Sequence, residues 1–224
     1  MIKKRGFFIL GVPFLLLSML LNFQFPDVQP LGEKLLTKIG IPTHQNMETK
    51  TGLHYVGVTS IALLLASLFL FNHSLAKYNG RVIFLAFLTA IFGPSLIINS
   101  YQQTFASGIY AISYERDASE CRFELNEETN LLYGDCSVYL ENKSSKDVQF
   151  SLVFIDDIHF KDDIPLQSLM NEAGPYFLTL KGRQSKTFKI TANIDVTSLP
   201  KYPAGGSSRG FNVIITDGER QRFL

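Results

Sequence analysis

Three long runs of uncharged, apolar residues constrain this chain more than any other feature of its sequence. They cover residues 6–23, 55–71 and 82–101. The hydrocarbon core of a bilayer is about 30 Å thick and needs about 20 helical residues to cross it, a length that each run approaches. Charged residues make up only 18% of the chain, against roughly 25% in soluble proteins. The sequence therefore predicts a membrane domain, residues 1–101, with three transmembrane helices.

The first run also fits a secretory signal peptide, because Lys3, Lys4 and Arg5 precede an apolar segment. The residues that follow it, QFPDVQP, contain no small-x-small cleavage site. We therefore interpret the run as an uncleaved anchor. Pro13 lies inside it and predicts a kink, since proline removes a backbone donor from a helix.

Positive charge at the ends of the runs predicts the topology, because basic residues concentrate in the cytoplasmic loops of membrane proteins. The residues that this rule places in the cytoplasm are Lys3, Lys4, Arg5, Lys77 and Arg81. Three crossings from a cytoplasmic N-terminus put the 23–54 loop and the C-terminal part outside. Lysines in this loop weaken the charge bias without reversing it. We expect a multi-pass protein of the cell membrane, and the compact layout favours a bacterial envelope.

The cysteine pair supports the same topology. Cys121 and Cys136 are the two cysteines of the chain, and both fall in the part that the charge rule sends outside, where disulfides persist. If they face each other on two antiparallel strands, Leu125 faces Leu132 and the inward faces of both strands match. The sequence predicts a structural disulfide between Cys121 and Cys136, with two free buried thiols as the alternative.

Residues 108–224 change from long apolar runs to short alternating ones, which are typical of β-strands. Turn clusters separate the strands, and an Asp-Gly pair at residues 217–218 indicates a late type I′ hairpin. Seven or eight short strands predict an extracytoplasmic, antiparallel, immunoglobulin-like β-sandwich. The predicted core residues are Phe123, Leu125, Val138, Leu140, Phe150, Leu152, Phe154, Phe188, Ile190, Val213 and Ile215.

The most polar cluster lies between residues 155 and 165. It contains Asp156, Asp157, His159, Asp162 and Asp163. Carboxylates and one imidazole suggest a metal, but the spacing lacks the order of a calcium-binding loop. We interpret the stretch as a solvated strand end and predict no metal, cofactor or catalytic residue.

The other polar features lie near the membrane. His44, Glu48 and His54 are interpreted as interfacial polar groups. Residues 31–40 predict a short amphipathic helix, and small residues at Ala62 and Ala66, matched by Ala86 and Ala90, favour packing of the second run on the third.

These features together predict a non-enzymatic membrane protein that presents its outer domain to another membrane or envelope protein. One alternative is an accessory subunit of a transporter or membrane enzyme. The second alternative is a metal-dependent envelope enzyme that uses residues 156–163. Residues 101–224 hold 13 Lys and Arg against 17 Asp and Glu, and this acidic balance argues against nucleic acid as a partner. The sequence predicts no oligomeric state.

Overall fold

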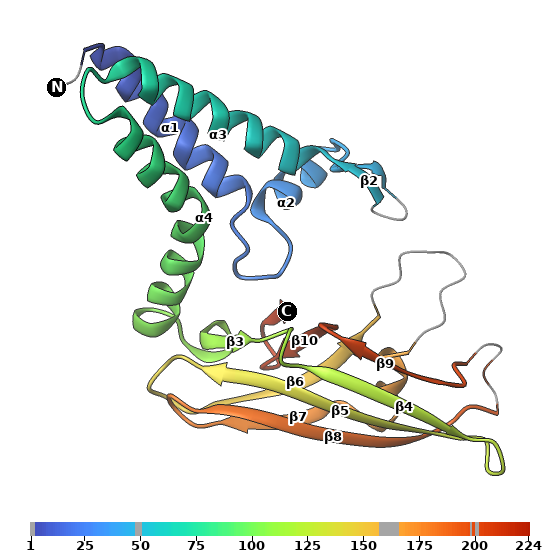
Figure 1. Ribbon diagram of the computed structural model, residues 1–224. Helices are drawn as coiled ribbons and strands as arrows, with labels where there is room; N and C mark the ends of the chain where they lie inside the picture. Colours follow the sequence, from blue (N-terminus) through green and yellow to red (C-terminus); the bar gives the residue numbers. More distant parts are fainter. Residues whose placement is uncertain (1–2, 48–50, 157–165, 198, 200–201) are drawn as a thin grey trace. The chain divides into compact units, whose positions relative to one another are not determined.

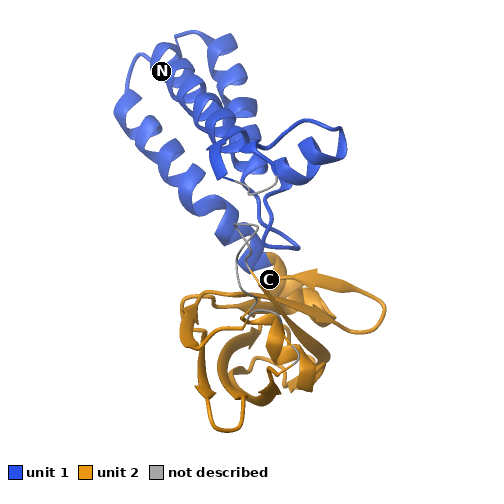
Figure 2. Cartoon of the chain, turned by 90° about the vertical axis from the view of Figure 1, so that its right-hand side faces the viewer, with its two compact units in different colours: residues 1–100 blue, residues 101–224 orange. Residues whose placement is uncertain are grey.

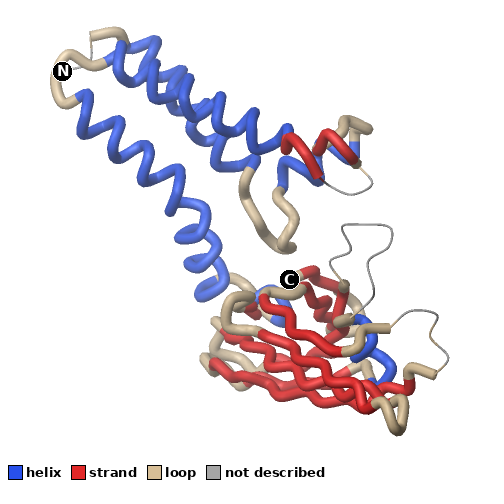
Figure 3. Tube along the Cα trace, turned by 45° about the vertical axis from the view of Figure 1, so that its right-hand side comes forward, coloured by secondary structure: helices blue, strands red, loops and turns tan. Residues whose placement is uncertain are grey.

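The computed structural model describes residues 3–47, 51–156, 166–197, 199 and 202–224. The chain divides into two compact units, residues 1–100 and residues 101–224 (Figure 2). Long helices make up most of unit 1, and strands make up most of unit 2 (Figure 3).

Unit 1 is built from long apolar helices together with a short helix and a small hairpin (Figure 1). Its elements are α1 (Arg5–Leu21), α2 (Leu31–Lys38), β1 (His44–Asn46), β2 (Thr51–His54), α3 (Tyr55–Ser74) and α4 (Asn79–Thr104). Gly40 follows the C-terminus of α2 with a φ of +77°, a left-handed conformation that glycine adopts at helix ends without strain.

Two helices among the described residues, α3 and α4, are long and apolar enough to cross a membrane. The sequence predicted three. The first apolar run forms α1, but this helix has only 17 residues, because the chain leaves the helical conformation after Leu21. Pro13 and Pro94 lie inside α1 and α4 and end neither helix.

The helices α1 and α3 pack along their length through serine hydroxyls. Ser60 Oγ donates to the carbonyl of Ser18 at 2.9 Å, and Ser67 Oγ donates to the carbonyl of Gly11 at 2.8 Å. Both serine side chains are buried. Gly11 lies against the ring of Phe71. A Cβ atom at position 11 would come within 2.9 Å of a carbon of this ring.

This packing differs from the expected contact of α3 with α4. Ala62, one of the small residues expected in that contact, is exposed. The serines point toward α1 instead, because the heptad spacing of Ser60, Ser67 and Ser74 places them on one face of α3.

Unit 2 contains two mostly antiparallel sheets. The first has the order β11-β10-β6-β7. Its strands are β6 (Val148–Ile155), β7 (Tyr176–Leu180), β10 (Asn212–Thr216) and β11 (Gln221–Phe223). A short 3-10 helix, η2 (Ser168–Ala173), precedes β7.

The second sheet is centred on β5 and has the order β3-β5-β4-β9, with β8 also paired to β5. Since β4 and β8 pair with the same residues of β5, they lie on its opposite sides. The strands are β3 (Ile112–Tyr114), β4 (Glu120–Asn126), β5 (Leu131–Asn142), β8 (Ser185–Asp195) and β9 (Gly205–Arg209).

The cysteines stand directly opposite each other on β4 and β5 and form a disulfide. Leu125 faces Leu132 in the same ladder, which is the predicted register. Both sulfurs point inward, and each cysteine is fully buried. The bond therefore closes a hairpin at the centre of the second sheet.

One cluster of buried side chains collects residues from both sheets of unit 2. It includes every predicted core residue except Leu125, which is partly buried at the rim. Polar side chains join the sheets. The hydroxyl of Tyr114 on β3 donates to the carbonyl of Phe211 at 2.8 Å, and burial raises the pKa of Tyr114 to about 12. Arg222 of β11 donates to the carbonyl of Ile109 at 3.0 Å.

Several local predictions were wrong. Residues 108–111 form a 3-10 helix (η1, Gly108–Ala111) rather than the start of a strand. The β10–β11 hairpin exists, but residues 217–220 form a four-residue loop, and of the Asp-Gly pair only Gly218 has a positive φ. A type I′ turn needs two such residues. The sequence also missed β7 and β9, because β7 is short and β9 lies in a segment that resembles a turn.

Candidate functional site

Asp156, the first residue of the acidic stretch, has a structural role at the start of η2. Its Oδ1 accepts the backbone N–H groups of Leu166, Gln167 and Ser168 at 2.9, 2.7 and 3.0 Å. Its Oδ2 accepts the Ser168 hydroxyl. The carboxylate therefore caps three backbone N–H groups at the start of η2. The other candidates of this stretch, Asp157, His159, Asp162 and Asp163, lie outside the described residues.

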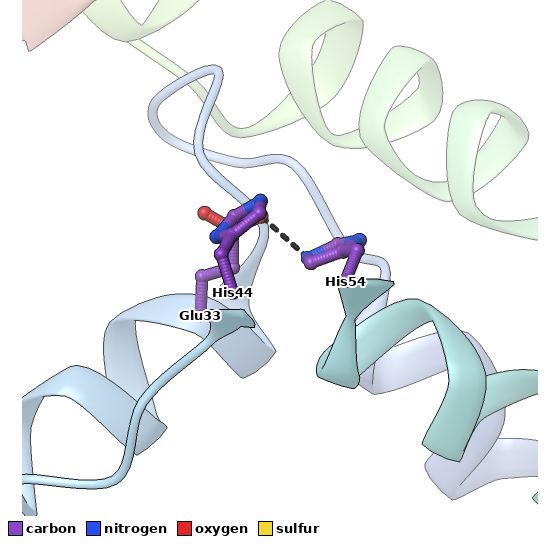
Figure 4. A group of neighbouring side chains, drawn as sticks. All are labelled: Glu33, His44 and His54. Carbon is purple, nitrogen blue, oxygen red and sulfur yellow. Dashed lines mark ion pairs between the residues drawn. The ribbon is translucent and has the colours of Figure 1, made fainter. Parts of the chain in front are cut away.

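A different group of metal-ligating side chains gathers in unit 1. Glu33 of α2, His44 of β1 and His54 of β2 each offer one ligand atom, and these atoms lie within 4.8 Å of one another (Figure 4). His54 Nε2 is 2.8 Å from Glu33 Oε1. The two imidazole rings stack with centroids 4.6 Å apart and planes 17° apart. Within the described residues, this is the group with the composition of a metal site.

Short local bonds bring these residues together. The β1–β2 hairpin pairs His44 directly with His54, and the Tyr55 N–H donates to the carbonyl of Thr43 at 2.9 Å where α3 begins. Glu33 reaches the hairpin because Gly32 fits against Val56 and Leu21, where a Cβ atom would come within 3.0 Å of both residues. The site is thus assembled by contacts of α2 with α1 and α3.

Sequence reasoning named two of these three residues and gave them a different role. The sequence predicts His44 and His54 at the membrane interface and does not single out Glu33, and Glu48 lies outside the described residues. The separations of 11 and 10 residues match no short ligand motif. The pairing of residues 44 and 54 across β1 and β2 makes the two histidines face each other, and no pattern in the sequence indicates that pairing.

Strand β7 forms an unprotected edge of the first sheet. It pairs with β6, and the part of the chain that the structure describes places no strand on its other side. Its sequence, YFLTL, has no charged residue, and Phe177 is 82% exposed. A shallow groove of about 450 Å³ lies over β6 on the side of Phe177 away from the free edge, and Phe177, Ser151 of β6 and Thr216 of β10 line it.

Two outer strands of the second sheet, β8 and β9, are better protected. β8 carries Lys186 and Lys189 on exposed positions, and β9 ends at Arg209, which pairs with Glu120 at 3.4 Å. Charged side chains, lysine above all, oppose the pairing of a sheet edge with another chain. β7 lacks this protection.

Asn142 belongs to an Asn-Lys-Ser sequon, but its side chain is fully buried. Its amide donates to the carbonyls of Lys146 and Lys181 at 2.8 and 3.1 Å. It is therefore a structural group that holds two loops together, and its amide nitrogen is inaccessible for glycosylation in the folded domain.

No family model, curated protein or solved structure shows significant similarity to the chain.

Proposed function

We propose that this chain is a multi-pass membrane protein that presents unit 2, as an immunoglobulin-like β-sandwich, outside the cell membrane, where it binds another membrane or envelope protein. The observation that carries the proposal is the uncharged edge of β7 with the exposed ring of Phe177. Two antiparallel sheets that contribute to one buried cluster support the sandwich.

Packing within unit 1 supports α1 as a third crossing, beside α3. Its 17 residues extend about 26 Å at 1.5 Å per residue. The hydrocarbon core is about 30 Å thick, and local thinning of the bilayer accommodates a difference of this size. Ile9 and Leu16 are exposed on its surface, as lipid-facing residues are. Serine-to-carbonyl bonds such as that of Ser67 to Gly11 are typical of contacts between transmembrane helices.

The proposed orientation follows from where the basic residues collect. The backbone N–H groups of Lys3 and Lys4 donate to the carbonyl of Ser74 at 2.7 and 3.1 Å. Lys77 and Arg81 follow in the next few residues, so basic side chains of two segments lie at one end of the α1–α3 pair. This end is cytoplasmic in the proposal, and a third crossing by α4 takes the chain outside.

Cysteine labelling tests this topology. We expect A76C to react with a membrane-impermeant maleimide only after lysis, and S207C to react in intact cells. Both parent residues are exposed, and the native cysteines form a disulfide that does not react. Labelling of both positions from outside, or protection of both, would contradict the three-span arrangement.

The proposed binding mode is pairing of a partner strand with β7. A free edge offers unpaired backbone N–H and C=O groups, and a side chain such as Phe177 gives an apolar anchor beside them.

A charge placed on the edge tests this mode. We expect T179K to abolish cross-linking from a photoreactive residue at position 177 to its partner in intact cells, because lysine disfavours strand addition. The matched control is T187K, on β8, which should leave the cross-link unchanged; both threonines are exposed. Equal cross-linking in the two variants would argue against β7. A partner that is a transporter or membrane enzyme would favour the accessory-subunit alternative.

A further inference from the structure

Glu33, His44 and His54 place three ligand atoms around one point between α2 and the β1–β2 hairpin (Figure 4). We propose that these residues bind a divalent transition-metal ion, and that Zn²⁺ is the ion that they favour. The site lies wholly within unit 1 and does not depend on the binding function proposed for unit 2.

The donor set determines the class of metal. Imidazole nitrogen is a ligand for Zn²⁺ and its first-row neighbours, whereas Ca²⁺ and Mg²⁺ prefer sites made of oxygen alone. Two histidines and one glutamate are also the ligands of zinc sites that keep a fourth position open. The three residues therefore fit a zinc ion that carries one water molecule.

The distances between the ligand atoms match this coordination after a small rearrangement. A tetrahedral zinc ion with bonds of about 2.0–2.1 Å separates its ligand atoms by about 3.3 Å. His54 Nε2 and Glu33 Oε1 are 2.8 Å apart, and one ligand atom from each of the three residues lies within 4.8 Å of the other two. Zinc binding therefore requires the close pair to spread by about 0.5 Å and His44 to move closer.

His54 Nε2 provides an independent indication of a ligand. This atom is buried, and within the described part of the chain it makes no hydrogen bond of acceptable geometry. The carboxylate of Glu33 is near it at 2.8 Å, but the two groups are not aligned as a hydrogen bond requires. Buried polar atoms are normally satisfied, and a metal ion between Nε2 and the carboxylate would satisfy both.

Neighbouring polar side chains contact His44 and Glu33 and orient them, as the groups around the ligands do in zinc sites. The Thr43 hydroxyl lies 3.2 Å from His44 Nδ1, which leaves Nε2 of that ring for a metal. Gln29 Nε2 donates to Glu33 Oε2 at 3.2 Å, which leaves Oε1 directed at His54. Glu33 is 9% exposed, so its carboxylate is held in a restricted position.

Metal content of the full-length protein tests the proposal. The protein is purified in detergent, stripped with a chelator and equilibrated with Zn²⁺. We expect about one bound Zn²⁺ per chain, and an increase in the melting temperature on adding Zn²⁺, because the ion binds the folded state. H44A and H54A should lose both effects. Q29A keeps all three ligands, and we expect it to bind Zn²⁺ about tenfold more weakly.

Two other histidine variants are the matched controls. H73A removes an exposed histidine at the end of α3, and H159A removes the histidine of the acidic stretch; both should bind Zn²⁺ like the wild type. The proposal is overturned if the wild type binds no stoichiometric Zn²⁺, or if H159A loses the ion while H44A and H54A keep it. Circular dichroism of each variant distinguishes a lost site from a lost fold, and Q29A tests the site with every ligand in place.

Discussion

Phe154→Ala should lower the free energy of unfolding of the 101–224 fragment by about 3–5 kcal/mol. Phe154 is 1% exposed, and its ring contacts those of Tyr176 and Phe211 at centroid distances of 5.9 and 5.6 Å. Truncation removes these contacts and leaves a cavity where the first sheet faces the shared core. Since small domains are stable by about 5–15 kcal/mol, this change removes a large part of the total. Chemical denaturation followed by circular dichroism measures it.

The control is the same substitution at an exposed phenylalanine. Phe177→Ala should change the free energy of unfolding by less than about 0.5 kcal/mol, because the ring is 82% exposed. Similar losses in the two variants would mean that the sheets of unit 2 do not share the core in solution. A fragment that is disordered by itself would show instead that unit 2 depends on unit 1 or on a partner.

The periodicity of the sequence was sufficient to predict the long strands. Along β5, β6 and β8, one face is buried and the other is exposed or half-buried, so the pattern of apolar residues reflects the burial directly. The pairing of Cys121 with Cys136 was predictable for the same reason, since both cysteines share the inward face with their neighbours.

Short elements were less predictable because long-range contacts decide them. β7 has five residues and β9 consists mostly of glycine and serine, so both depend on the strands beside them. The first apolar run forms a helix, but the helix ends at Leu21, where the chain turns toward α2. The position of that turn cannot be predicted from hydropathy.

The candidate metal site was unpredictable for a related reason. Its three residues come from α2, β1 and β2, and none is close to another along the chain. What joins them is the pairing of a two-stranded hairpin and the close approach of Gly32 to Val56. Neither the three-residue strand β1 nor the glycine contact leaves a periodic signal, whereas the acidic stretch at residues 156–163 gives a strong local signal. The described part of that stretch, Asp156, serves as a cap.

Removal of the disulfide should destabilise unit 2 by about 3 kcal/mol, the value expected for the closure of a loop of this length in the unfolded chain. The two cysteines are 15 residues apart and join adjacent strands. C121A/C136A should therefore unfold at a lower denaturant concentration than the wild-type fragment, in a single cooperative transition with circular dichroism as the probe. The double alanine variant avoids placing hydroxyl groups in a site that is fully buried.

Reductant separates loop closure from packing. Alanine also removes two buried sulfur atoms, and the resulting cavities add to the loss. The reduced wild type keeps both sulfurs, so the difference between oxidised and reduced wild type reports the bond alone. We expect reductant to lower the stability of the wild type by about 3 kcal/mol and to leave C121A/C136A unchanged. If reductant has no effect on the wild type, the bond contributes nothing through the unfolded state, and β4 and β5 are held together by their ladder and their inward side chains alone.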